Sequence, residues 1–360
     1  KNDGTVAVWG SSSSGGNAAN VSGLHDVKKI YATDSAFAAL RNDGSVFTWG
    51  SNFFGGDSST VNDLTDVKEI YNTSSTFAAI KNDGTVLIWG YYFNPLNMQL
   101  SHLDNLRANN ESTVAMKSDG SVAVWGNLTG GGNPAQVSTL NDFQEISSFG
   151  NAFAALKNDG TVFVWGSSNQ SDVNSLTNVK KIYATDSAFA ALRHDGTVFV
   201  WGSSLYGGNP AQVSSLSNVK EIFSTRFSFA ALRNDGTVYA WGSASYGGEA
   251  AQVSGLTDVK KIYATQGAFV AIKNDGSVFV WGNSSDGGNP TQISGLSDVK
   301  EIYSNTRAFA ALKNDGTVFV WGNAAEGGNP AQVSGLSDVK EIYSTDNAFA
   351  ALKNDGTVYV

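Results

Sequence analysis

The sequence predicts an all-β protein built from nine near-identical units, and three observations lead to this prediction. A motif [Lys/Arg]-x-Asp-Gly recurs throughout the 360 residues, a Trp-Gly pair follows it eight residues later, and apolar runs last only about five residues before a glycine interrupts them. The motif begins at residues 1, 41, 81, 117, 157, 193, 233, 273, 313 and 353. Seven spacings are 40 residues and two are 36, which gives nine whole units and eight additional residues.

Each unit contains three short segments rich in β-branched and aromatic residues, which favour strands. Examples are "KEIYST" at 340–345, "AFAAL" at 348–352 and "TVFVWG" at 317–322. Asn-Asp-Gly between the second and third segments indicates a hairpin turn, because glycine tolerates positive φ and Asp bonds its own backbone. We therefore expect each unit to be an antiparallel meander of three strands, with "AQVS", as at 331–334, as a candidate fourth strand.

The strand 317–322 is apolar on both faces apart from its first residue, so it needs a packed layer on each side. Sheets stacked face to face around an axis supply those layers, and repeated units of about 40–45 residues with four strands are typical of β-propeller blades. The small residues of "AFAAL" suit the crowded region between blades. One Trp per unit at a constant position indicates core packing instead of ligand binding.

The phrase "AFAALKNDGTVFVWG" at 308–322, followed in most units by a glycine-rich loop, resembles the regulator-of-chromosome-condensation repeat. The resemblance covers essentially the whole chain and implies a β-propeller, commonly of seven blades. The compact period is closer to bacterial relatives such as the type II β-lactamase inhibitory protein than to the eukaryotic exchange factor. The His that often precedes the second strand in the family is absent here, as at Ala36-Phe37, so no role of that His carries over.

We expect nine blades in one closed ring, forming a single domain over 1–360. A ring joins its two ends, because an open edge strand invites aggregation. The first segment, "KNDGTVAVWG", can supply the outer strand of the last meander, but so can the last segment, "KNDGTVYV". One of the two copies is therefore surplus, and we expect either that the C-terminal copy is displaced or that the chain is cut from a longer array.

Composition limits the classes of function. The net charge of −9 disfavours binding to nucleic acid or anionic membranes and is expected to keep the protein a soluble monomer. The absence of cysteine excludes disulfides and thiolate metal sites. No membrane-spanning or signal segment is expected, although the chain begins at Lys1 and its true start is expected to be missing. The compartment stays open, with a secreted or cell-surface bacterial context favoured.

The nine units differ mainly in two zones, namely the two residues before "AFAAL" and the loop after Trp-Gly. Antiparallel pairing places both zones at one end of the meander and the uniform Asn-Asp-Gly turns at the other. Variable loops on a rigid scaffold are typical of binding sites, whereas drift of surface turns is the plainer explanation. Exposed aromatic residues favour binding over drift.

Two sectors carry the candidate partner-binding residues. The first combines an Arg with aromatic residues, which is a common composition of interaction hot spots. The second contains several aromatic residues in and beside a shortened unit of 36 residues, 81–116, which has lost the "KEIY" phrase. There, filling a hole in the core is an equally good explanation. The first sector contains Arg226, Phe227, Tyr246 and Tyr206, and the second contains Phe53, Phe54, Tyr91, Tyr92 and Phe93. Arg307 and Gln266, from the variable pairs of two other units, complete the candidates.

No catalytic constellation is unique to one unit, and the three histidines, His25, His102 and His194, fall at different positions of the repeat. We expect no enzyme activity, no metal and no cofactor. The function predicted is a scaffold that presents one variable face to a protein partner. The resemblance implies partners such as a small GTPase or β-lactamases, none of which the residues here specify. A carbohydrate-binding lectin or adhesin and a structural array without ligand are the alternatives.

Overall fold

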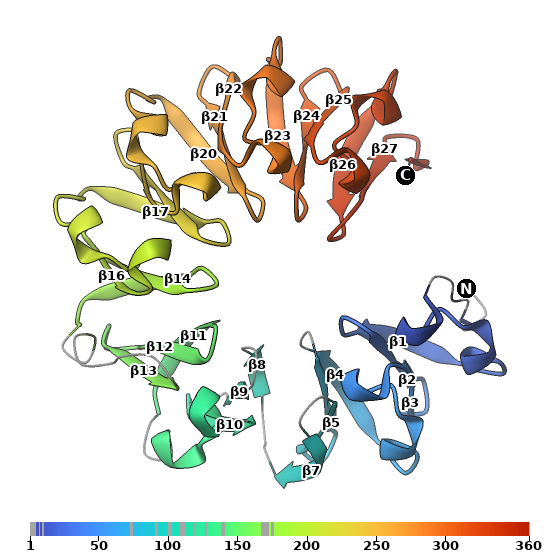
Figure 1. Ribbon diagram of the computed structural model, residues 1–360. Coiled ribbons are helices and arrows are strands. Elements are labelled where there is room, and N and C mark those ends of the chain that lie inside the picture. Colours follow the sequence, from blue (N-terminus) through green and yellow to red (C-terminus); the bar gives the residue numbers. More distant parts are fainter. Residues whose placement is uncertain are drawn as a thin grey trace. The chain divides into compact units, whose positions relative to one another are not determined.

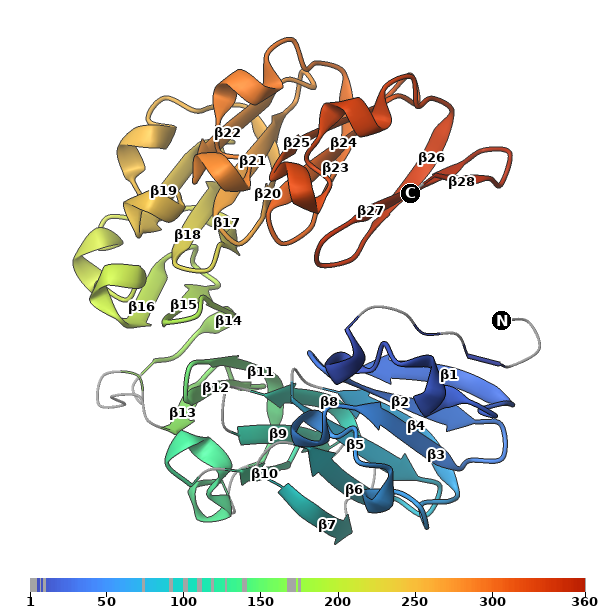
Figure 2. The same ribbon diagram turned by 45° about the vertical axis from the view of Figure 1, so that its right-hand side comes forward.

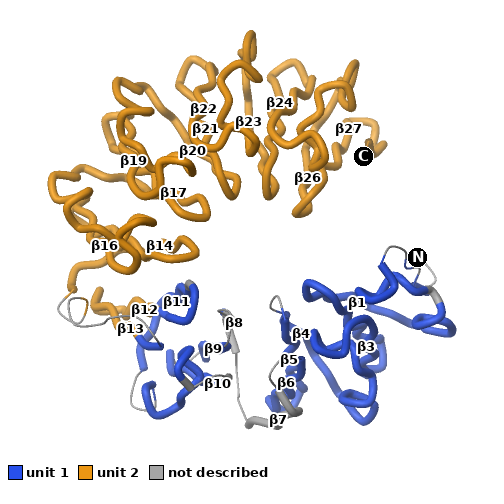
Figure 3. Tube along the Cα trace, viewed as in Figure 1, with its two compact units in different colours: residues 1–153, 165–167 blue, residues 154–164, 168–360 orange. Residues whose placement is uncertain are grey.

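The computed structural model describes residues 5–6, 8, 11–72, 75–90, 93–99, 103–108, 112–117, 120–126, 128–137, 141–166, 173 and 176–359. These residues form two units, coloured separately in Figure 3. Unit 1 comprises residues 1–153 and 165–167, and unit 2 comprises 154–164 and 168–360. Each is described by itself.

The described residues form nine antiparallel sheets that follow one another in chain order, as predicted (Figure 1). Eight have three strands and one has four. Unit 1 contains β1 (Val27–Ala32), β2 (Ala36–Arg41) and β3 (Val46–Gly50); β4 (Val67–Asn72), β5 (Thr76–Lys81), β6 (Thr85–Gly90) and β7 (Phe93–Gln99); and β8 (Leu103–Ala108), β9 (Ser112–Lys117) and β10 (Val122–Gly126). The division between units passes through the sheet of β11 (Phe143–Phe149), β12 (Ala152–Lys157) and β13 (Val162–Gly166).

Unit 2 continues with five sheets of three strands, in which neighbouring first strands touch. They are β14 (Val179–Ala184), β15 (Ala188–Arg193) and β16 (Val198–Gly202); β17 (Val219–Ser224), β18 (Ser228–Arg233) and β19 (Val238–Gly242); β20 (Val259–Ala264), β21 (Ala268–Lys273) and β22 (Val278–Gly282); β23 (Val299–Ser304), β24 (Ala308–Lys313) and β25 (Val318–Gly322); and β26 (Val339–Ser344), β27 (Phe349–Lys353) and β28 (Val358–Tyr359).

The expected fourth strand is wrong. "AQVS" and its equivalents form short 3-10 helices, because the Asn of Gly-Gly-Asn-Pro caps them: the Asn209 side chain accepts a hydrogen bond from Ala211 N–H at 3.1 Å. In the described part of the chain the short helices are of the 3-10 type, except η5, which is a single π-helical turn interrupted at Gly131. They are η1 (Ser12–Ser14), η2 (Ala18–Val21), η3 (Asn52–Phe54), η4 (Ser58–Thr60), η5 (Leu128–Gly132), η6 (Pro134–Gln136), η7 (Ser204–Tyr206), η8 (Pro210–Gln212), η9 (Ala244–Tyr246), η10 (Ala250–Val253), η11 (Ser284–Asp286), η12 (Pro290–Ile293), η13 (Ala324–Glu326) and η14 (Pro330–Val333).

The shortened unit 81–116 lacks the "KEIY" phrase found in other units but keeps the corresponding strand, since β8 pairs with β9. It also adds a strand, because β7 pairs with β6 to give the four-stranded sheet. In the other 36-residue unit, 157–192, most of the shortened segment 167–176 lies outside the described residues. No helix in the described part of the chain is long and apolar enough to cross a lipid bilayer.

The last sheet is completed by the C-terminal copy of the repeated phrase, since β28 pairs with β27 through Ala351 and Leu352 (Figure 2). In unit 1, Val6 and Val8 of the N-terminal copy pack against a core cluster that includes Leu24. Stacked three-stranded sheets are consistent with the predicted propeller blades. The closed ring and the single domain stay predictions.

The core lies in the joints between sheets, as the two-sided apolar strands predicted. Ala230 and Leu232 of β18 share one buried cluster with Phe269 and Ala271 of β21, so small residues of one sheet face large residues of the next. Large residues against small ones allow sheets to interlock at high packing density.

In five units the tryptophan N–H binds a loop glycine of the preceding sheet, whereas the buried indole nitrogens of Trp49, Trp125 and Trp201 have no hydrogen-bond partner among the described residues. Trp241 stacks on Phe229 of its own sheet with ring centroids 5.2 Å apart, and its indole N–H donates to the carbonyl of Gly207, in the preceding sheet's loop, at 3.2 Å. Gly207 has φ of 104° and a Cβ there would lie 2.7 Å from the Phe229 ring. The constant Trp and the constant Gly-Gly are therefore two halves of one contact.

The first strand of each described sheet lies at a sheet edge, and a bulge is present in β1, β4, β8, β14, β17, β20, β23 and β26. In β17 the pairing skips from Val219 to Glu221, so Lys220 lies outside the register. The same skip leaves out Lys28, Lys68, Lys180, Lys260, Lys300 and Lys340. Bulges and lysines are the features that protect an edge from pairing with another strand.

Replacing Gly207 with Ala tests the joint. The new methyl group meets the Phe229 ring and also forces a side chain to positive φ, so we expect a loss of about 2–4 kcal/mol in the free energy of unfolding, measured by urea denaturation. Gly255→Ala is the matched control, because Gly255 has φ of 78° but open space around it. Equal losses in the two variants would contradict the packing role.

The Asp of each hairpin turn makes the fold sensitive to acid. Asp235 accepts hydrogen bonds from the hydroxyl and backbone N–H of Thr237 at 2.7 and 2.9 Å, and these bonds lower its pKa below the ordinary 3.8. A lowered folded pKa stabilises the protein above the ordinary value, and this contribution disappears as pH falls through the folded pKa. We expect the urea midpoint to fall on acidification below about pH 4, and less steeply in Asp235→Asn. Identical pH profiles for the two proteins would contradict this.

Candidate binding surface

The two variable zones lie at the same end of each meander, as predicted. In one unit the backbone N–H of Ser243, after β19, donates to the carbonyl of Phe227, before β18, at 3.0 Å. In unit 2 we call this end the variable rim. It consists of the turns 185–187, 225–227, 265–267, 305–307 and 345–347 and the loops 203–206, 243–246, 283–286 and 323–326.

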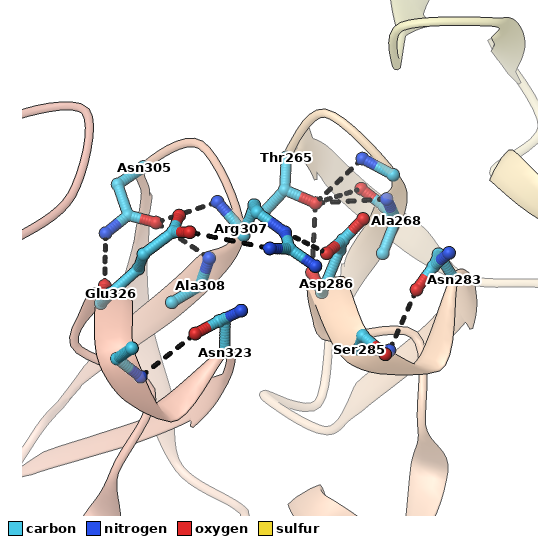
Figure 4. Close-up of polar contacts among 12 residues, drawn as sticks. Thr265, Ala268, Asn283, Ser285, Asp286, Asn305, Arg307, Ala308, Asn323 and Glu326 are labelled. Carbon is cyan, nitrogen blue, oxygen red and sulfur yellow. Dashed lines mark hydrogen bonds and ion pairs between the residues drawn. The ribbon is translucent and has the colours of Figure 1, made fainter.

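A buried side chain joins the turn to the loop. The Thr265 hydroxyl accepts from the N–H of Ala268 at 3.0 Å and donates to the carbonyl of Asp286 at 3.0 Å (Figure 4). Asn305 does the same work in the next unit, where its amide nitrogen donates to the Glu326 carbonyl at 2.5 Å. The turn and the loop therefore keep one geometry while their outward residues differ.

A ladder of backbone hydrogen bonds runs along the variable rim, one step per sheet. The N–H of Asp186 donates to the carbonyl of Arg226 at 2.9 Å, and Arg226 donates to Gln266 at 2.8 Å. Gln266 donates to Thr306 at 2.9 Å, and Thr306 to Asp346 at 3.1 Å. Only main-chain groups make these bonds, so the side chains at these five positions can change without breaking them.

The uniform end is held differently. Asn234 of the hairpin turn donates through its side-chain amide to the side chain and carbonyl of Asn218 at 2.9 and 3.1 Å. Arg233 lies over the Tyr239 ring, 5.9 Å from its centroid. These contacts give the Asn and the Arg of this turn a structural role, in addition to the turn's need for glycine. Much of the contrast between the two ends thus has a structural cause.

The first predicted sector is assembled as expected. Phe227 lies between Tyr206, from the preceding sheet, and Tyr246, with ring centroids 4.6 and 4.8 Å away. The Arg226 guanidinium lies 5.2 Å from the Phe227 centroid, and its Nε lies 2.5 Å from Asp186 Oδ2. The four predicted residues therefore form one contiguous cluster over two sheets.

The cluster has an exposed part that the sequence did not single out. Leu205, beside Tyr206 on η7, is 73% exposed, and the Arg226 and Asp186 side chains are 51% and 53% exposed. Phe227 is only half-buried by its two neighbours. Asp186 could have been found from its position, 40 residues before Arg226, which is one repeat earlier. Leu205 carries no such signal.

Arg307 belongs to a polar cluster two sheets further on (Figure 4). Its Nε lies 2.6 Å from Asp286 Oδ1 and its Nη1 lies 3.6 Å from Glu326 Oε1. The Asp286 side chain is only 9% exposed, and its hydrogen bond raises the pKa of Arg307, so the guanidinium stays charged. Gln266 lies on the ladder, exposed.

The second predicted sector is described only in part. Phe53 is 73% exposed on η3, whereas the half-buried Phe54 packs against a core cluster that contains Phe77 and Trp89. Filling the core is therefore the better interpretation for Phe54. Tyr91 and Tyr92 lie outside the described residues, and of Phe93 only the backbone is described.

The two histidines in the described part of the chain have separate surroundings. Exposed His25 lies 2.6 Å from its neighbour Asp26, the backbone N–H of His194 donates to Asn178, and His102 lies outside the described residues. Over the described residues, no three His, Asp or Glu side chains gather as a metal ion would need. That the chain is not an enzyme stays a prediction.

Comparison with known proteins gives one family match. The model of the regulator of chromosome condensation (RCC1) repeat matches residues 27–55. That segment begins at β1 and ends in the loop after η3, so it spans one meander and its rim. No sequence among the curated proteins matches the chain.

Solved structures show distant similarity. The designed protein Ika8 is 18% identical, with 82% of this chain and 96% of that one covered and a TM-score of 0.37. The CRINKLY WD40 ectodomain of the Arabidopsis thaliana receptor kinase ACR4 is 16% identical, with 60% and 80% covered and a TM-score of 0.39. Prp20p from Saccharomyces cerevisiae, described with its binding properties to Gsp1p and histones, is 14% identical, with 91% and 77% covered and a TM-score of 0.35.

Removing the Thr265 hydroxyl tests the link between turn and loop. In Thr265→Val the Asp286 carbonyl and the Ala268 N–H lose their partner, and we expect a loss of about 1–3 kcal/mol in unfolding free energy by urea denaturation. Thr265→Asn is the control and should lose little, since Asn305 fills the equivalent position in the next sheet. Similar losses for Val and Asn would show that the hydrogen bonds do not matter.

Proposed function

We propose that the chain is a non-catalytic scaffold that presents its variable rim to a protein partner. The observation that carries this proposal is the backbone ladder from Asp186 to Asp346, whose hydrogen bonds are made by main-chain groups alone. Side chains on such a ladder are free to diversify for recognition, because the fold does not depend on them.

The contact residues of this proposal are the exposed ones near the aromatic cluster. Leu205, Arg226, Asp186 and Gln266 are exposed, whereas Tyr206 and Phe227 are half-buried and Arg226 lies over the Phe227 ring. An Arg beside aromatic and aliphatic groups is a composition that contributes strongly to protein interfaces. The pairing of Arg226 with Asp186 also holds the guanidinium over the ring before a partner arrives.

A glycan ligand is less well supported. A lectin of this design needs an aromatic platform repeated from blade to blade, but the positions of Tyr206 and Tyr246 are taken by Asp286 and Glu326 in the next two units. A single platform at one joint favours a protein epitope over repeated sugar sites.

The proposal also covers the blade number, the closure of the ring, the oligomeric state, the origin and the compartment of the protein. Because the other units repeat the phrases of the matched segment 27–55, we propose nine RCC1-like blades that close into one propeller over residues 1–360. The monomeric state, the bacterial origin and the secreted or cell-surface context are also proposed, as is the absence of nucleic-acid binding.

The test is capture of partners from lysate, compared between variants and read by mass spectrometry. Leu205→Ser with Arg226→Ala removes exposed contact groups, and we expect loss of the captured partner with an unchanged melting temperature, because both side chains are largely in solvent. A glycan array on the same proteins examines the alternative.

A steric pair provides the control. Ser245→Arg adds bulk to an exposed rim loop, and Ser217→Arg adds the same bulk beside Asn218 at the uniform end. Binding through the rim predicts that only Ser245→Arg blocks capture. Equal capture by all the variants, or a block by Ser217→Arg alone, would overturn the proposed surface.

A further inference from the structure

The half-buried residues of the variable rim contact one another across the joints between sheets. At two joints of unit 2 the last residue of a turn contacts a loop residue of the preceding sheet and a loop residue of its own sheet. One joint holds the aromatic set Tyr206–Phe227–Tyr246, and another holds the charged set Asp286–Arg307–Glu326. In the sheet between them, Gly267 leaves room for Asp286 of the same sheet.

These sets are not interchangeable one residue at a time. A Cβ on Gly267 would lie 2.1 Å from Asp286 Oδ2, so a larger residue there displaces the carboxylate that binds Arg307. A Phe in place of Arg307 would leave the Asp286 carboxylate, with 9% of its side chain exposed, without its counter-charge. Each joint residue is thus matched to particular neighbours.

Below the rim, the aromatic packing and its hydrogen bonds to the preceding sheet are nearly the same at three successive joints. The Phe–Trp stacks at 229/241, 269/281 and 309/321 have centroid distances of 5.2, 5.1 and 5.2 Å. Each of these tryptophans donates to a loop glycine of the preceding sheet at 3.1–3.2 Å. Because these core contacts are the same at each of these joints, a sheet could pack on any other of these sheets, in the same molecule or in a second copy. Such interchangeable packing permits domain swapping and misassembly of repeats.

We propose that the joint residues of the variable rim are a pairing code that selects each sheet's neighbour in the chain and excludes sheets of a second copy. The code is carried by Tyr206, Phe227, Tyr246, Gly267, Asp286, Arg307 and Glu326. It uses the buried side of the rim, while partner binding uses the exposed side, so the two roles are tested independently.

The experiment copies the aromatic set onto the charged joint. Arg307→Phe alone breaks the charged set, and Asp286→Tyr with Arg307→Phe and Glu326→Tyr rebuilds the aromatic set there. Gln266→Ala is the control, because Gln266 is an exposed ladder residue outside the code. The urea midpoint reports stability. Refolding an equal mixture of two differently tagged copies of each variant, followed by co-purification, reports exchange between chains.

We expect a lower urea midpoint in Arg307→Phe, recovery of most of the loss in the triple variant, and a wild-type midpoint in Gln266→Ala. The triple variant should nevertheless form more mixed-tag dimer than the parent chain, because two of its joints then carry the same set. A parental midpoint in Arg307→Phe, or no more mixed dimer in the triple variant than in the parent, would overturn the proposal.

Discussion

Five tryptophans of the repeated Trp-Gly pair, namely Trp89, Trp165, Trp241, Trp281 and Trp321, join two sheets, because the ring stacks within one sheet while the N–H binds the loop of the sheet before it. The contact fixes the distance between sheets and brings the loop glycine against the next phenylalanine ring. Other features of unit 2 follow from this spacing. Only at that separation can one turn reach the next and form the backbone ladder along the variable rim.

Different groups make the structural contacts at the two ends of the meander, so substitutions have different effects on the fold at each end. At the hairpin end, side chains such as Asn234 and Arg233 make the structural contacts, so a substitution there weakens the fold. On the variable rim, main-chain groups and one buried Thr or Asn do this work. The remaining residues divide into those turned toward a neighbouring sheet, such as Arg307, and those turned toward solvent, such as Leu205.

Much of this arrangement was predictable from the sequence, since short apolar segments and Asp-Gly turns specify a meander locally. The buried Trp, the shared end of the two variable zones and the cluster around Phe227 follow from the repeat itself. The error over "AQVS" arose because an Asn cap and a Pro, as at Asn209 and Pro210, outweigh apolar composition. The Asp286–Arg307 pair was not predictable, because it depends on how closely two sheets approach.

The lysine bulge on seven of the first strands limits how such an array can grow. A bulged edge that carries Lys220 or its equivalents is a poor template for another strand, so a sheet does not widen at that edge. The added strand, β7, pairs at the opposite edge, on β6, and a further unit is accommodated as a layer laid flat on the last. Duplication or deletion of a unit therefore alters the length of the stack while every surviving layer keeps the kind of neighbour it had.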